Sequence, residues 1–450
     1  MGARYVGIGV FLLSVVAVIG HVSAASDPAS SPFLFTIAKK YVADAWLRGE
    51  ERFPSGSQVY VQTGIQRRLL VSGFQATADP AVSFDGLHVL FAGKEKPANP
   101  WQVYQAEIDG SNVRRVTSAK QDCIRPLYLP GDRFVYARKV DGRFAIEAAP
   151  LAGGAATSLT YWPANSLPTD VLRDGRILFE AGFPSGGGPI SELFTVYADG
   201  SGVESYRCDH NHSRSAGRQM GSGDILFAQP GGLGRFTSAQ AQQLNGNAPR
   251  GEYAGDVAET ASGDWIVAWR SHSPKPFALR LWKPESNRLQ PLAGELENDV
   301  VQPVVLAARA TPNRHPSGLH DWNYANLLCL NAYTSKLKFT DGSIETVELR
   351  TLEAAGMERV LGTAHVEKDG SFYLRTPADR PLKIALLDHD GKILHQEKGW
   401  FWLRRGEQRV CVGCHAGPET APENAVPSVL LRSTIPADMT GAPAASKGGQ

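Results

Sequence analysis

Cysteine is scarce in this chain of 450 residues, and methionine is scarcer still, with five of the first and four of the second. Yet two of the five cysteines lie close together, in the stretch GEQRVCVGCHAGPETAPENAVP at residues 406–427. The other three, Cys123, Cys208 and Cys329, leave room for at most one disulfide. Because Cys123 and Cys329 lie in or beside apolar stretches, we expect both to be small buried hydrophobes.

An excess of one charge is also missing, because 46 lysines and arginines balance 45 aspartates and glutamates. This balance gives no reason to expect nucleic acid or an anionic membrane surface as a partner. The apolar run at residues 6–19 follows Arg4 and precedes small residues at 22–24, and it is shorter than the roughly 20 residues that a spanning helix needs. We therefore predict a signal peptide at 1–24, export to the periplasm or beyond, and no membrane anchor after cleavage. An uncleaved anchor is the alternative.

The two neighbouring cysteines belong to a Cys-x-x-Cys-His motif made of Cys411, Cys414 and His415. Two thiols at this spacing can add across the two vinyl groups of one haem, and the histidine that follows can reach the iron. A redox Cys-x-x-Cys pair and half of a zinc site are alternatives, but neither needs a histidine at that position. The motif therefore predicts covalent haem c bound by these three residues.

Five similar phrases recur in the first two-thirds of the chain, each a Gly/Asp turn followed by a short apolar strand. Most are followed by a second strand, and their spacing is about 43 residues, the length of four strands with turns. Units of this size stack radially as the blades of a β-propeller, whereas a sandwich of ordinary hairpins is the alternative. We expect about six blades, with the sixth joining residues 299–309 to early strands at 57–65 and 67–73. The phrases lie at 84–93, 130–138, 173–181, 221–229 and 261–269.

Beyond the repeat, alternating strands with Asp-Gly turns at 368–370 and 389–391 predict a small β-sandwich and not a helical cytochrome. We expect this sandwich to face the propeller axis. The predicted architecture is all-β, a propeller of about six blades followed by a β-sandwich that carries the Cys-x-x-Cys-His motif. Its parts are a signal peptide at 1–24, an N-terminal segment at 25–56, the β-propeller at 57–311, a linker at 312–318, the β-sandwich at 319–432 and a disordered tail at 433–450.

The runs at residues 366–394 (VEKDGSFYLRTPADRPLKIALLDHDGKIL) and 400–427 (WFWLRRGEQRVCVGCHAGPETAPENAVP) resemble the haem-bearing middle domain of the hydrazine synthase alpha family, which also follows a propeller. The Asp-Gly phrases resemble the propeller repeats of the Tol translocation system. The resemblance implies a haem that is a site of chemistry with a zinc ion beside it. In that family the motif histidine turns toward the zinc, and a tyrosine four residues later binds the iron. Here that position is Glu419, so His415 is also a candidate for an ordinary iron ligand.

Cys208, Asp209 and His210 lie in a loop between the third and fourth phrases, where thiol, carboxylate and imidazole together make a metal-ligand set. A polar loop with one buried cysteine is the alternative. The resemblance implies a zinc ligand from a propeller cysteine, and Cys208 is the best match. We therefore expect His415 to bind haem iron or zinc, and Cys208, Asp209 and His210 to be candidates for zinc.

Two classes of function remain open. The first is a haem redox enzyme that acts on a small molecule in a pocket between propeller and sandwich. The second is a non-catalytic role, either as an electron carrier for a redox partner protein or as a binding or sensor module with a structural haem. With a single Cys-x-x-Cys-His motif, we do not expect hydrazine synthesis. No catalytic residue, substrate or oligomeric state follows from the sequence.

The surroundings of the haem have further candidate residues. The haem could be lined by Trp400, Phe401 and Trp402, of which at least one should belong to the sandwich core. The candidates for a distal iron ligand are His315 and His320.

Overall fold

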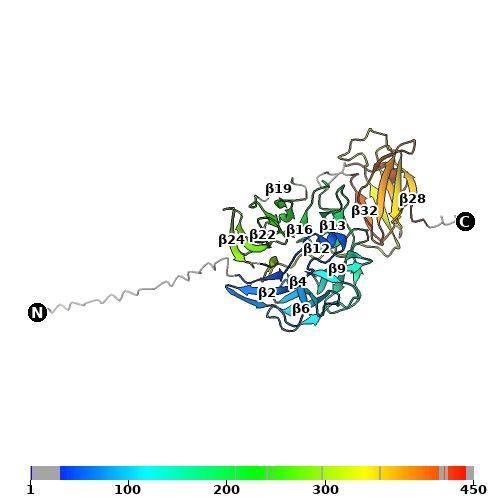
Figure 1. The fold of residues 1–450 in the computed structure, drawn as a ribbon. Coiled ribbons are helices and arrows are strands. Elements are labelled where there is room, and N and C mark those ends of the chain that lie inside the picture. Colours follow the sequence, from blue (N-terminus) through cyan, green and yellow to red (C-terminus); the bar gives the residue numbers. More distant parts are fainter. Residues whose placement is uncertain are drawn as a thin grey trace.

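The computed structural model describes residues 2, 31–207, 209–239, 242–245, 247–294, 297–353, 356–414, 420 and 424–441, and these form mainly β-structure (Figure 1). Apart from Gly2, the predicted signal peptide lies outside the described residues, as do Cys208, His415 and Glu419. In the part of the chain that is described, no helix has the length and apolar character needed to cross a membrane.

Six four- or five-stranded sheets follow one another along the first part of the chain, which confirms the predicted propeller of six blades. The blades are β4–β7, β8–β11, β12–β15, β16–β19 and β20–β24, and the sixth joins β25 to β1, β2 and β3. The strands are β1 (Phe33–Ala38), β2 (Ser57–Thr63), β3 (Gln66–Leu69), β4 (Ala76–Val82), β5 (His88–Lys94), β6 (Gln102–Glu107), β7 (Arg114–Arg115), β8 (Cys123–Leu129), β9 (Arg133–Val140), β10 (Arg143–Pro150), β11 (Thr157–Ser158), β12 (Ser166–Val171), β13 (Ile177–Phe183), β14 (Ile190–Val196), β15 (Glu204–Ser205), β16 (Ser215–Gln219), β17 (Ile225–Gln229), β18 (Gly232–Phe236), β19 (Leu244–Asn245), β20 (Glu252–Tyr253), β21 (Ala258–Glu259), β22 (Trp265–Arg270), β23 (Ala278–Lys283), β24 (Arg288–Ala293) and β25 (Asp299–Val305).

The sixth blade closes the ring by pairing the two ends of the propeller. Strand β25 runs antiparallel to β1, with Val300 opposite Ile37, and β1 in turn pairs with β2. The propeller therefore begins at residue 33 and not at residue 57 as expected. The apolar stretch FLFTIA lacks the Gly/Asp turn of the other phrases, which is why the repeat pattern did not include it.

Buried ion pairs close the propeller axis. Asp79 in β4, Arg125 in β8 and Asp256 between β20 and β21 all have positive φ. The Arg125 guanidinium donates to both Asp256 oxygens at 2.7 and 3.0 Å, and its backbone N–H donates to Asp79 Oδ2 at 3.0 Å. Arg52, from the segment that covers the axis, donates to the same Asp79 oxygen at 2.6 Å. Burial opposes ionisation of Asp256, but Arg125 and Arg218 lower its pKa to about 2.

The second domain is the predicted sandwich of two sheets, ordered β32-β26-β29-β33 and β28-β27-β30-β31. The turn at 389–391 joins β30 and β31 as a hairpin, as predicted. The turn at 368–370 does not make a hairpin, because it passes from β28 in one sheet to β29 in the other. The elements are β26 (Tyr324–Cys329), β27 (Thr346–Leu352), β28 (Glu358–His365), β29 (Phe372–Pro377), β30 (Leu382–Leu387), β31 (Ile393–Gln396), β32 (Gln408–Cys411), the short helix α1 (Ser428–Arg432) and β33 (Ala437–Asp438).

The described part of the expected disordered tail, residues 433–441, belongs to the sandwich. Strand β33 pairs in parallel with β29, and Met439 directly after it is only 2% exposed. The rest of the expected tail, residues 442–450, lies outside the described residues.

The sandwich packs against the side of the propeller, at the third blade and the segment leading into it, and not over the axis as expected (Figure 1). Trp402 is fully buried against Trp162, with ring centroids 5.1 Å apart, and its Nε1 donates to Gly200 O at 2.9 Å. Arg409 Nη1 also donates to Val203 O, at 2.9 Å. Close packing and polar contacts thus join the two domains.

Candidate functional site

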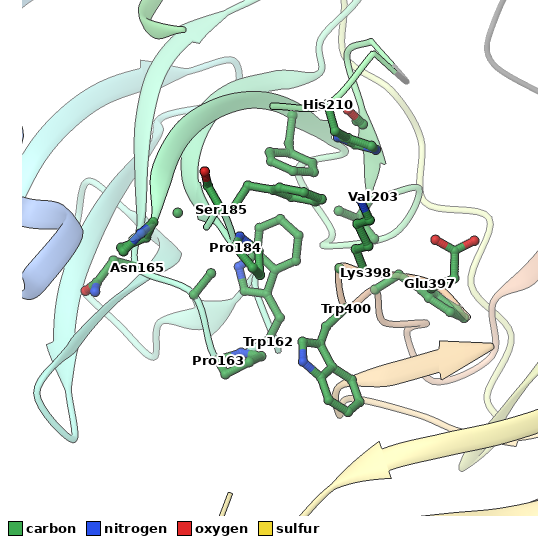
Figure 2. Close-up of a pocket in the computed structure, with 18 of the residues that line it drawn as sticks. Trp162, Pro163, Asn165, Pro184, Ser185, Val203, His210, Glu397, Lys398 and Trp400 are labelled. Atoms are coloured by element: carbon green, nitrogen blue, oxygen red, sulfur yellow. The ribbon is translucent and has the colours of Figure 1, made fainter. Parts of the chain in front are cut away.

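A cavity of about 620 Å³ lies where the two domains meet, within the usual size range of small-molecule sites (Figure 2). The propeller supplies Trp162, Phe183 and Phe194 to its wall, and the sandwich supplies Trp400 and Phe401. The lining is mainly apolar, with a few polar groups between the rings. Such a wall excludes water and suits a flat, apolar group.

The sandwich side of the cavity comes from a segment that was expected to be one strand. Strand β31 ends at Gln396, and residues 397–401 line the cavity before Phe401 pairs again with Leu382 of β30. Trp402 instead enters the propeller core. At least one of these three aromatic residues was expected in the sandwich core, but the buried one, Trp402, lies in the core of the propeller, and the other two line the cavity.

The Cys-x-x-Cys part of the motif follows strand β32, which runs parallel to β26. Cys411 is half-buried and Cys414 is buried, and both carry free thiols. Neither thiol lines the cavity, but Phe401, which does, packs against the same sandwich core that contains Cys414 and contacts Cys411. Burial raises the pKa of the Cys411 thiol to about 11, with Glu397 adding to the shift and Arg409 opposing it. The motif thus lies beside the cavity wall.

Cys329 is a third thiol at this place. It ends β26 directly beside Cys411, and its pKa is raised by a hydrogen bond with the Cys414 thiol and by burial. The prediction that Cys329 is a buried residue is confirmed, but its contact with the motif could not be seen in the sequence. Cys123 is buried in the propeller, as expected.

Gly413, between the two motif cysteines, is fixed by close packing. A Cβ there would lie 2.1 Å from Thr334 O and 2.7 Å from Asn331 O. Because both are backbone oxygens, we expect Gly413→Ala to lower the free energy of unfolding of the haem-free chain by about 1–3 kcal/mol. Chemical denaturation measures this change. Gly318→Ala is the control, since a Cβ there meets nothing within 4 Å and the change should be near neutral.

Two of the zinc candidates, Asp209 and His210, lie within the described residues, and they have different surroundings. Asp209 receives bidentate hydrogen bonds from Arg214, both at 2.9 Å, and although burial opposes the shift, these bonds hold the pKa of Asp209 below its usual value. Both of its oxygens are therefore used within the loop. His210 lines the cavity and stacks on Phe183, with ring centroids 4.4 Å apart.

Glu192, which sequence reasoning missed, positions His210. Its buried carboxylate lies 2.6 Å from His210 Nδ1 and also accepts a hydrogen bond from Asn211 N at 2.9 Å. A carboxylate on one ring nitrogen directs the other toward a metal or substrate in many histidine sites. No sequence signal marks Glu192, because it lies within an ordinary strand, β14.

Other histidine candidates lie elsewhere. His315 stacks on Tyr197 at 3.9 Å, and His320 stacks on Trp322 at 4.5 Å. Neither lines the interdomain cavity. Within the described residues, no group of three metal-ligating side chains is found, and the predicted zinc set depends on Cys208 and His415, which lie outside them.

Part of this chain is similar in sequence to a known protein family. Residues 331–416 match the family model of the hydrazine synthase alpha subunit middle domain. The chain is 29% identical to hydrazine synthase subunit alpha of Kuenenia stuttgartiensis over 101 residues, which is 22% of this chain and 12% of that subunit. The structure also aligns with the solved hydrazine synthase of Kuenenia stuttgartiensis, over 90% of this chain and 72% of that chain. The TM-score is 0.78 and the sequence identity is 16%.

Residues 331–416 are thus similar to the middle domain of the hydrazine synthase alpha subunit, and the fold of the chain is similar to that of hydrazine synthase. TolB from Acinetobacter baumannii also aligns, over 62% of this chain and 68% of its own, with a TM-score of 0.47 and 13% identity. Because the sequence match covers only 12% of the synthase subunit, it shows similarity to part of that subunit and does not show that this chain has the same activity. Two free thiols with two residues between them are the pair that a covalently bound haem needs.

Proposed function

We propose that this hydrazine synthase alpha-like chain is an exported, single-haem c-type protein that acts on a small molecule in the cavity between its two domains. The observation that carries the proposal is the aromatic cavity beside the Cys-x-x-Cys segment. The relationship to the synthase alpha subunit supports it. Export directed by a signal peptide at 1–24, which is then cleaved, completes the proposal, because covalent haem is attached outside the cytoplasm.

Cys411 and Cys414 would hold the haem through two thioether bonds, and His415 is the expected iron ligand. The haem would supply an iron that changes oxidation state and binds a small molecule. Trp162, Phe183 and Trp400 would exclude water from the reacting molecule. His210, oriented by Glu192, would present its ring to the same space.

Zinc beside the haem is the second part of the proposal. Cys208 and His210 are the proposed ligands, with His415 as a third if it does not bind the iron, and Asp209 is left out because Arg214 holds both of its oxygens. Thiolate and imidazole are the ligands that zinc prefers. Metal analysis of the purified protein tests this part. One zinc per chain, lost in Cys208→Ser, is expected, and a wild type free of zinc would contradict it.

Covalent attachment is tested by expressing the full chain with a cytochrome c maturation system. The wild type should keep its haem colour through denaturing electrophoresis, and Cys414→Ser should lose most of it, because one of the two thioether bonds cannot form. Cys123→Ser is the matched control, since Cys123 is buried in the propeller and should not affect the colour. A colourless wild type would end the haem proposal.

A non-catalytic electron carrier is the second candidate. Val410, next to Cys411, is 56% exposed, so the motif strand reaches the protein surface, where a redox partner protein could approach. The synthase relative is named as a subunit, and work with partner proteins would suit both candidates. Neither candidate is itself a complete hydrazine synthase.

A further inference from the structure

Three cysteines meet where two distant parts of the sandwich domain come together. Cys329 ends strand β26, and Cys411 ends strand β32 in register beside it. Leu330 N donates to Cys411 O at 2.9 Å, which ties the two strand ends together. Cys414 folds back into the same buried cluster as Cys329. The haem motif, which needs two thiols, therefore has a third beside it.

Cys329 and Cys414 are the two more deeply buried of the three thiols. Cys329 is 1% exposed, Cys414 is 6% exposed, and both belong to the same buried core cluster of the sandwich. Cys411 is half-buried and packs at the margin of the cluster. The close packing of Gly413 against the loop after β26 also holds Cys414 in this position.

We propose that Cys329 forms a disulfide with Cys414 in the haem-free protein and that this disulfide delays haem attachment. Each of the two thiols would lose one hydrogen atom, and the two electrons and two protons would convert a disulfide oxidant to two thiols. An exported chain meets such oxidants as it folds. The bond would join residues far apart in the chain, and so would restrain the unfolded chain more than a Cys411–Cys414 bond does.

The consequence for haem rests on the proposed function. Each thioether bond forms when a thiol S–H adds across a haem vinyl group, with sulfur bonding to one carbon and hydrogen to the other. Cys414 has no S–H to add while it is bonded to Cys329, so only Cys411 can attach. Reduction of the disulfide by a dithiol would return Cys414 to the motif. Cys329 would thus link haem attachment to a reduction step.

Peptide mapping of the haem-free protein tests the disulfide itself. The full chain is expressed with its export signal but without haem maturation, equilibrated with glutathione disulfide, digested without reduction and analysed by mass spectrometry. We expect a peptide that links Cys329 to Cys414 as the main product. A Cys411–Cys414 link, or free thiols at all three positions, would overturn the proposal.

Haem content tests the consequence in the same full chain with the maturation system present. Cys329→Ala should raise haem per chain by about two-fold if half of the wild-type chains carry the disulfide. Cys123→Ala is the matched control, because Cys123 is equally buried but lies in the propeller. Equal haem content in wild type and Cys329→Ala would overturn the delay. Cys329→Ser is a second variant that also lacks the thiol, and its melting temperature shows whether a change in haem content comes from misfolding. If no variant takes up haem, the proposed function fails while the peptide map still decides the disulfide.

Discussion

Arg125→Met is expected to lower the free energy of unfolding by about 3–5 kcal/mol, because it leaves the buried Asp256 without its bidentate partner. Asp79 loses a neighbouring positive charge at the same time, although the backbone N–H of residue 125 remains its donor. Both carboxylates are buried, and the contact of Arg218 with Asp256, at 3.5 Å, is too long to replace the bidentate pair. Urea unfolding followed by tryptophan fluorescence measures the loss.

Arg288→Met is the control for this measurement. Arg288 is exposed on the outer strand β24, and its replacement should change stability by less than about 0.5 kcal/mol. Equal effects of the two substitutions would show that the axis ion pairs do not hold the blades together. The same ion pairs close the propeller axis, so we expect small molecules to reach the interdomain cavity from the side of the molecule.

The second large effect is expected from Trp402→Ala, which should cost about 3–5 kcal/mol and separate the two domains. Trp402 is a sandwich residue buried in the propeller core, where it contacts Trp162 and donates to Gly200 O. Without it, the linker at 312–318 should be cut faster in limited proteolysis, and thermal unfolding should divide into two transitions.

Trp322→Ala is the control for the docking measurement. Trp322 is 37% exposed and stacks on His320 and Tyr324 away from the interface. A single transition and unchanged proteolysis are expected for this variant. If Trp402→Ala behaved in the same way, the cavity between the domains would not depend on this anchor, and its walls would have to be held by other contacts.

The propeller could be predicted from the sequence because each blade repeats a turn and a strand of its own. The closing partner of β25 was harder to place, since β1 carries no such turn and only the register of Val300 with Ile37 reveals it. The sandwich was predicted from alternation alone. The predicted start of the disordered tail at residue 433 was wrong because β33 has only two residues, and its pairing with β29 arises only in the folded domain.

The candidate site was only partly visible in the sequence. The motif identified Cys411 and Cys414 by spacing, but the cavity beside them is made by residues from both domains that share no pattern. Cys329 and Glu192 lie in ordinary strands, and only the packing of those strands brings them to Cys414 and His210. Such long-range contacts depend on tertiary structure, so no local pattern predicts them.

The most direct test of the account is the absorption spectrum of the purified, haem-loaded protein, reduced with dithionite and recorded with and without carbon monoxide. An iron that faces the interdomain cavity should be high-spin and five-coordinate, and carbon monoxide should bind it and shift its main absorption band. A low-spin, six-coordinate iron that ignores carbon monoxide would contradict a site for small-molecule chemistry and would favour an electron carrier.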